Sequence, residues 1–267
     1  MSTVVATATR AEGGKSHTTP TPSRAEQWLP TLLSVIAGMV DLTGFLTLGI
    51  FTAHVTGNIV LVGALIVRHG RVNPAQILAI PVFVIAVAVT WLIAKASARR
   101  GLGLMRLLLL IQFLLIATLL IFSATTKPSV DRRGVMATFA AMIAVTTMGC
   151  QYALLRLTLP VAPSTAVMTG NLTNAVLGLL DLISGSQPLI ENDRKRLTRA
   201  LRLLVGFFVG CVLATAAVIY LRDWAWSLPT ALAAVAVALC SGDNIKSLPA
   251  KGPLAGKVGL PTETADA

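Results

Sequence analysis

The sequence predicts an all-α, polytopic helical membrane protein of six to eight membrane segments, built from two repeats that a pseudo-two-fold axis relates. Composition, the length of the apolar blocks and a repeated tripeptide predict this class. The 267 residues are 55% hydrophobic and 12% charged, with a mean hydropathy of +0.77, whereas soluble domains carry about 25% charged residues. The apolar residues fall in long blocks, several of which are long enough to cross about 30 Å of hydrocarbon. They run from Leu29 to Phe51, Ile77 to Ala94, Leu107 to Phe122, Val135 to Leu155, Leu201 to Leu221 and Trp224 to Cys240.

The apolar blocks separate two tails from two membrane repeats. Residues 1–28 are rich in Thr, Ser, Pro and Gly, and the apolar block behind them is too long for the core of a signal peptide. Residues 242–267 contain Gly and Pro and lack an amphipathic period. We therefore expect a disordered cytoplasmic tail at each end, with a first repeat at 29–125 and a second at 130–241.

The positive charge of the chain indicates a lipid partner. The formal net charge is +11, and the Lys and Arg residues fall in short stretches between the apolar blocks. At such places basic residues orient helices and meet anionic lipid. We expect the lipid bilayer of the bacterial inner membrane as the partner, and no nucleic acid.

Motifs of enzymes are missing from the sequence. It contains no His-Glu-x-x-His, no Gly-rich phosphate loop with Lys and no Gly-x-Ser-x-Gly. Cys150, Cys211 and Cys240 each lie inside an apolar run without Cys-x-x-Cys spacing, so packing is their expected role. We expect neither an enzyme nor a cofactor or metal site.

Two similar segments suggest the internal repeat. His54-Val-Thr-Gly-Asn58 has a counterpart in Val167-Met-Thr-Gly-Asn171, and both follow a long apolar block across a break. A short apolar stretch follows each, then a basic loop at 68–71 or 194–202, a long helix with Phe near its start, and one more apolar block. The chain therefore reads as two copies of a four-segment unit.

These motifs also carry a resemblance to a known family. Gly38-Met-Val-Asp41, Phe51-Thr-Ala-His-Val-Thr-Gly-Asn58, Met148-Gly-Cys-Gln151 and Thr169-Gly-Asn171 are similar to the YoaK family of bacterial membrane proteins, over about residues 30 to 240. The family is a domain of unknown function. The resemblance implies a multi-pass inner-membrane protein and supplies no substrate.

The number of crossings stays open at this level. With eight crossings or with six, sixteen basic residues lie on the cytoplasmic side and six lie outside, so the positive-inside rule does not choose. Val55 to Val67 has 13 residues, which is roughly 20 Å of helix and short for a full span. If the Thr-Gly-Asn segments are re-entrant, six crossings form two inverted repeats; otherwise eight crossings form two parallel ones.

The two Thr-Gly-Asn motifs are the expected site. Gly allows a break in the helix, and Thr and Asn can cap the helix that follows. Breaks at matching positions in two halves point to a central binding site for a solute or ion. Alternatively, the motifs only cap helices and fasten the halves together. The residues expected to meet near the axis are Thr56, Gly57, Asn58, Thr169, Gly170 and Asn171, with Asn174 adding an amide one turn further on.

Asp41 is the expected ionisable group of this site. It lies about a dozen residues into the first apolar block, where an ionised carboxylate costs about 2.5 to 3.5 kcal/mol. We expect a partner, His54 or Arg156, and either a coupling carboxylate or a structural one. His54 can relay protons or donate to a backbone carbonyl, and Gln151 occupies the place in the second half that Asp41 holds in the first.

Two functions fit these expectations. The first is a small secondary transporter or permease for a small solute or ion, with Asp41 as the proton-coupling group. The second is a non-transporting membrane scaffold or stress-related protein whose polar motifs are structural. The sequence leaves the substrate, the coupling ion and the formation of a homo-oligomer open.

Overall fold

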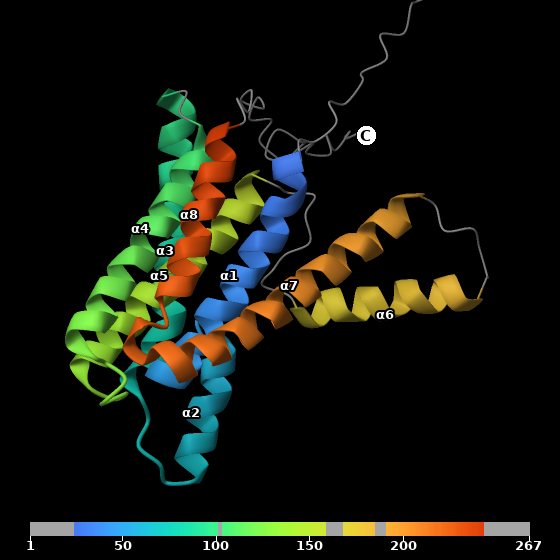
Figure 1. Ribbon diagram of the computed structural model, residues 1–267. Coiled ribbons are helices and arrows are strands. Elements are labelled where there is room, and N and C mark those ends of the chain that lie inside the picture. Colours follow the sequence, from blue (N-terminus) through green and yellow to red (C-terminus); the bar gives the residue numbers. More distant parts are fainter. Residues whose placement is uncertain (1–23, 101–102, 159–167, 185–190, 243–267) are drawn as a thin grey trace, which may run out of the picture.

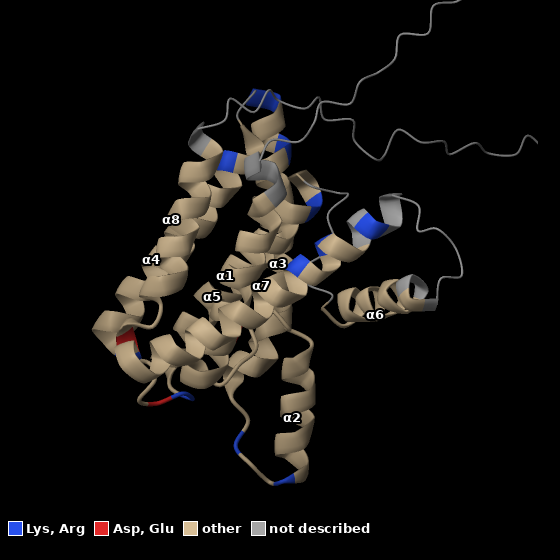
Figure 2. Cartoon of the chain, turned by 45° about the vertical axis from the view of Figure 1, so that its right-hand side comes forward, with Lys and Arg blue, Asp and Glu red and all other residues tan. Residues whose placement is uncertain are grey.

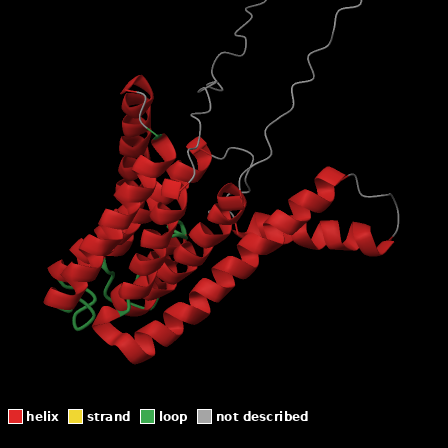
Figure 3. Cartoon of the chain, turned by 45° about the horizontal axis from the view of Figure 1, so that its top comes forward, coloured by secondary structure: helices red, strands yellow, loops and turns green. Residues whose placement is uncertain are grey.

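The computed structural model describes residues 24–100, 103–158, 168–184 and 191–242, and these residues form helices joined by loops (Figure 3). The eight α-helices of this part are α1 (Arg24–Leu48), α2 (Gly57–Val67), α3 (Pro74–Arg100), α4 (Leu104–Thr126), α5 (Val135–Thr158), α6 (Met168–Ser184), α7 (Glu191–Leu221) and α8 (Ser227–Gly242). A 3-10 turn, η1 (Arg222–Trp224), joins α7 to α8.

The helices confirm the all-α prediction and the expectation of several membrane segments. Within the described ranges, five helices are long and apolar enough to cross a membrane, and they are parts of α1, α3, α4, α5 and α7. Helices α2 and α8 are apolar but shorter. Figure 2 shows the charged residues toward the helix ends and along the first part of α7, with the rest of the visible ribbon uncharged.

Helix α1 departs from the expected block at both ends. It begins at Arg24, inside the stretch expected to be tail, and it stops at Leu48 rather than continuing to Phe51. Gly49 takes a φ of +73°, which a residue with a Cβ rarely adopts. The apolar block Leu29–Phe51 is therefore a helix followed by the start of a non-helical segment, residues 49–56.

The basic stretch 194–202 is helical, so the expectation of a loop there is wrong. It belongs to α7, which spans 31 residues. Lys, Arg and Leu favour helix, and Ala200 and Leu203 are buried while Arg199 and Arg202 are exposed. Arg199 and Arg202 therefore lie on the exposed side of a continuing helix.

Helices α1, α3, α4, α5, α7 and α8 form a bundle in which α1 packs on α7, α3 on α5, and α4 on α5 and α8. At one end, which we name the Leu48 end, the Asn73 side chain donates to the carbonyls of Leu48 (3.0 Å) and Arg132 (2.9 Å). The first turn of α1 and the last turn of α8 lie together at the opposite end (Figure 1). We name it the Trp28 end, where the Arg202 guanidinium lies 5.2 Å from the Trp28 ring centre.

The six bundle helices alternate in direction along the chain. Because α3 starts beside Asn73 at the Leu48 end and spans 27 residues, its last residues, Arg99 and Arg100, lie at the Trp28 end. Figure 1 shows α2 and α6 outside this alternation, with α2 extending below the lower end of the bundle and α6 extending from its side.

Helices α1 and α7 cross at backbone contact. A Cβ added at Gly38 would lie 2.2 Å from the Phe207 carbonyl oxygen, and one at Gly210 would lie 2.1 Å from the Val35 carbonyl oxygen. Ser34 Oγ donates to the Leu203 carbonyl at 2.7 Å. Small residues at such spacing are typical of close helix pairs in membranes, and they fix α1 against α7.

Candidate functional site

The candidate site is built on residues 49–56, the non-helical segment between α1 and α2. This segment folds back along α1, since the Thr52 side chain fills the space beside Gly44, where an added Cβ would lie 2.7 Å from Thr52 Cγ2. Phe51 stacks on Phe45, with ring centres 4.7 Å apart. The free backbone of the segment therefore lies against the last two turns of α1 rather than in solvent.

Asp41 accepts the hydrogen bonds that this segment donates. Its Oδ1 accepts the backbone N–H groups of Thr52 and Ala53, both at 2.7 Å, and the Thr52 hydroxyl at 3.4 Å. Its Oδ2 lies 2.6 Å from His54 Nδ1. The residue is 5% exposed, so the chain's own donors replace water around a buried carboxylate.

His54 is the side-chain partner of Asp41, which selects between the two partners expected from the sequence. Arg156, the other one, is an exposed residue at the end of α5. The His54 side chain is 36% exposed, and its ring meets the edge of Phe207 at 5.3 Å between centres. A partly accessible imidazole thus connects the buried carboxylate to the outside of the bundle.

Asn58 holds the other end of the break. Its Oδ1 accepts the Phe51 N–H at 2.9 Å, and its Nδ2 donates to the Phe51 carbonyl at 2.8 Å. The side chain is fully buried, so one amide satisfies both backbone groups of one non-helical residue. Gly57 allows this arrangement, because an added Cβ would lie 3.0 Å from the Phe51 ring.

Thr56 does not act as the cap that the sequence suggests. It stands at the N-cap position of α2 in a helical conformation, with φ −65° and ψ −24°, and its side chain makes no capping hydrogen bond. It is exposed. The helical dihedrals explain the difference, since a capping side chain normally requires an extended N-cap residue.

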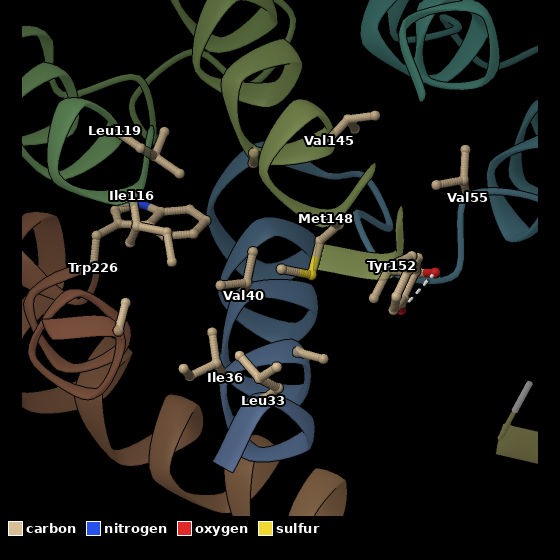
Figure 4. Packing of buried hydrophobic residues seen from close by; sticks show 14 of the residues in the cluster. Leu33, Ile36, Val40, Val55, Ile116, Leu119, Val145, Met148, Tyr152 and Trp226 are labelled. Carbon is tan, nitrogen blue, oxygen red and sulfur yellow. Dashed lines mark hydrogen bonds between the residues drawn. The ribbon is translucent and has the colours of Figure 1, made fainter. Parts of the chain in front are cut away.

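Tyr152 is a site residue that the sequence analysis missed. It lies on α5, and its hydroxyl donates to the Ala53 carbonyl at 3.2 Å (Figure 4). The second half of the chain therefore supports the broken segment of the first half. The signal available in the sequence was its position next to Gln151.

Gln151 forms a second polar cluster deeper in the bundle. Its Nε2 donates to the Leu33 carbonyl at 2.8 Å, and its Oε1 accepts from Gln112 Nε2 at 2.7 Å. The cluster ties α1, α4 and α5 together. Leu33 lies two turns from Asp41 along α1, and Figure 4 shows it on the side of α1 that carries Ile36 and Val40.

The second Thr-Gly-Asn motif opens α6. Asn171 is buried, whereas Thr169 and Asn174 are exposed and Gly170 is intermediate. Helix α6 packs on α7 and α2 packs on α3, and the two short helices extend in different directions in Figure 1. The expected meeting of Asn58 and Asn171 stays a prediction, and the segment before α6, residues 159–167, lies outside the described residues.

The groups of the site can form hydrogen bonds and are of the kinds that exchange protons. The Asp41 carboxylate can take up a proton, His54 can pass one, and the donors around them fix the geometry of both. Over the ranges that the structure describes, His, Cys, Asp and Glu side chains do not gather in groups of three that could hold a metal ion.

Comparison with known proteins agrees with the resemblance drawn from the motifs. Neither a curated protein nor a solved structure matches the chain. A family model described as "Protein of unknown function (DUF1275)" matches residues 29–240, which takes in most of α1 and α8, all of α2 to α7 and both Thr-Gly-Asn motifs. This is the YoaK-like family of multi-pass membrane proteins, whose function is unknown. The chain belongs to the DUF1275 family.

Proposed function

We propose that this membrane protein is a small secondary transporter or permease for a small solute or ion, with Asp41 as the group that takes up the coupling proton. One observation carries the proposal: a buried carboxylate is paired with a partly exposed histidine at a break between two helices. Ionisable residues inside membrane proteins are costly and mark proton or substrate pathways. Unwound backbone at such a place is typical of transporter binding sites.

Proton uptake would act on the segment that Asp41 holds. Hydrogen bonds to an ionised acceptor are roughly twice as strong as those between neutral groups. A proton that arrives through His54 neutralises the carboxylate and weakens its bonds to the Thr52 and Ala53 amides. The freed amides then face the solute, so protonation and solute binding are coupled at one segment.

Six crossings and inverted repeats fit this function. A two-fold operation would exchange the two halves helix by helix: α1 with α5, α2 with α6, α3 with α7 and α4 with α8. It maps the α1–α7 contact onto the α5–α3 contact, and the α4–α5 contact onto the α8–α1 contact. The same exchange leaves the α1–α5 and α4–α8 pairs unchanged. Because the exchanged helices run in opposite directions, the axis lies in the membrane plane, as in many secondary transporters.

Matching residues support the same symmetry. Gly38 on α1 lies against the backbone of Phe207 on α7, and an added Cβ at Gly149 on α5 would lie 3.4 Å from the Phe83 carbonyl oxygen on α3. Each half therefore contributes one glycine to a close contact between its own first helix and the third helix of the other half.

The charge of the two ends favours a cytoplasmic Trp28 end in the bacterial inner membrane. Lys95, Arg99, Arg100, Arg106 and Arg156 lie at the helix ends there, and the basic first part of α7 is near them. The Leu48 end mixes Arg with Asp131 and Asp223. Lys and Arg are in excess on the cytoplasmic side of membrane proteins, so both termini are cytoplasmic.

Charge movement in reconstituted membranes tests the proposal. Purified protein in liposomes on a solid-supported membrane is exposed to a panel of amino acids, sugars, organic acids and small ions. We expect at least one class to produce a transient current that Asp41→Asn removes. Asp131→Asn, a control at an exposed carboxylate, should keep the current. A panel without any protein-dependent current, or a current that survives Asp41→Asn, contradicts the proposal.

The second candidate is a non-transporting scaffold or stress-related protein, and a different observation favours it. The acceptors of Asp41 and both polar atoms of Asn58 are already used by the chain's own groups. In that case the same residues only fasten the break. Asp41→Asn then lowers the abundance and thermal stability of the protein and leaves no transport to lose.

A further inference from the structure

A groove opens on the side of the bundle at the Leu48 end. It lies between the first turns of α3 and α5, and its volume is about 310 Å³. Both helices begin at this end, so the groove runs from the end of the bundle along its length. Its lining residues are Pro74, Leu78, Arg133, Val135, Thr138, Phe139 and Met142.

The lining of the groove is mostly apolar and carries one positive charge. Leu78, Val135 and Phe139 are exposed along it. Arg133 is its charged lining residue; it is exposed and precedes the first residue of α5 by two positions. From Val135 to Met142 the groove covers eight residues of helix, roughly 10 Å along the helix axis. Since α5 is long and apolar enough to span a membrane from Val135 onward, the position of Arg133 just before it fits the depth of the lipid headgroups.

We propose that this groove binds one anionic phospholipid, with an acyl chain between α3 and α5 and the phosphate on the Arg133 guanidinium. Arg recognises phosphate through two parallel N–H bonds, and the groove faces the layer from which acyl chains come. This inference depends on the bundle lying in a bilayer and not on transport by the Asp41 site.

The charged side chains of residues 131–133, next to the groove, sum to a positive charge. Asp131 Oδ1 accepts the backbone N–H of Arg133 at 3.1 Å, and the Asp131 side chain also lies next to Gly134. Arg132 extends toward Gly49, where an added Cβ would lie 4.0 Å from its Cδ. Residues 131–133 thus carry two guanidinium groups and one carboxylate, and the lining residue among them is Arg133, which favours an anionic over a zwitterionic headgroup.

Native mass spectrometry of the full-length protein tests the proposal. The protein is released from detergent after incubation with equal amounts of phosphatidylglycerol and phosphatidylethanolamine of the same acyl chains. We expect one phosphatidylglycerol to bind in preference. Arg133→Gln should reduce the preference by about fivefold, the effect of one basic residue near a lipid surface. Lys127→Gln, which removes an exposed charge from the same loop without touching the groove, should leave it unchanged.

A second variant tests the apolar part. Thr138→Trp fills the groove and should reduce binding of both lipids, whereas Val84→Trp, at an exposed position of α3 outside the groove, should not. Equal binding of the two lipids to the unmodified protein, or a full preference in Arg133→Gln, overturns the proposal. Loss of phosphatidylglycerol to an excess of inorganic phosphate also overturns it, because the site then recognises phosphate and not lipid.

Discussion

Replacement of Asn58 by Ala removes the two hydrogen bonds that hold Phe51 at the break. The Asn58 side chain is fully buried, and its two polar atoms bond the Phe51 N–H and carbonyl at 2.9 and 2.8 Å. Each backbone group left without a partner costs about 1 to 3 kcal/mol. Because Phe51 is only partly buried, water reaches part of its backbone, and we expect a loss of about 2 to 4 kcal/mol in the free energy of unfolding.

The assay is reversible unfolding of the purified protein in mixed micelles, with increasing fractions of a denaturing detergent and helicity as the signal. Asn174→Ala is the matched control, since it removes the exposed amide of the second half and should change the free energy of unfolding by about 0.5 kcal/mol or less. A loss below about 1 kcal/mol for Asn58→Ala, or an equal loss for both variants, refutes the assigned role.

Three further predictions follow from the packing and the ends of the bundle. Gly210→Ala should lower the free energy of unfolding by at least about 1 to 3 kcal/mol, because the added Cβ would lie 2.1 Å from a backbone oxygen of α1. The control Gly63→Ala adds a Cβ in open space, so it should be neutral or slightly stabilising in the same titration. Asn73→Ala removes three side-chain hydrogen bonds, two to the Leu48 and Arg132 carbonyls and one from the Ala75 N–H, and should cost at least about 1 to 2 kcal/mol in thermal unfolding. An unchanged midpoint contradicts its role at the Leu48 end. In a variant without native cysteines, Cys at position 99 should react with an impermeant thiol reagent only after the membrane is permeabilised, and Cys at position 133 before it; the reverse order excludes the six-crossing arrangement with cytoplasmic termini.

Composition and block length were sufficient to predict the membrane helices, because long apolar stretches have few alternatives in a bilayer. The break before α2 was also predictable, since an Asp inside an apolar block and a Thr-Gly-Asn after it both need local partners. The pairing of Asp41 with His54 was one of two expected solutions, and proximity along the chain favours it. These features depend on residues fewer than twenty positions apart.

The rest of the site depends on contacts between distant residues. Tyr152 reaches Ala53 across 99 positions, and Ser34 reaches Leu203 across 169. Their partners are backbone carbonyls, which carry no sequence signal. The exact start of α7 was missed because a run of Arg and Lys is compatible with a loop and with a helix. The internal repeat and the meeting of Asn58 with Asn171 stay predictions.

The backbone contact between α1 and α7 has a consequence for biosynthesis. The groups that it joins are separated by 169 residues in the chain, and at about 5 to 20 residues per second the ribosome needs roughly 10 to 30 seconds to make that length. The hydrogen bonds of Asp41 can form much earlier in synthesis, because its donors follow within 13 residues. During that interval the small-residue face of α1 has no α7 to pack on. It must therefore contact lipid or an insertion factor until α7 leaves the ribosome.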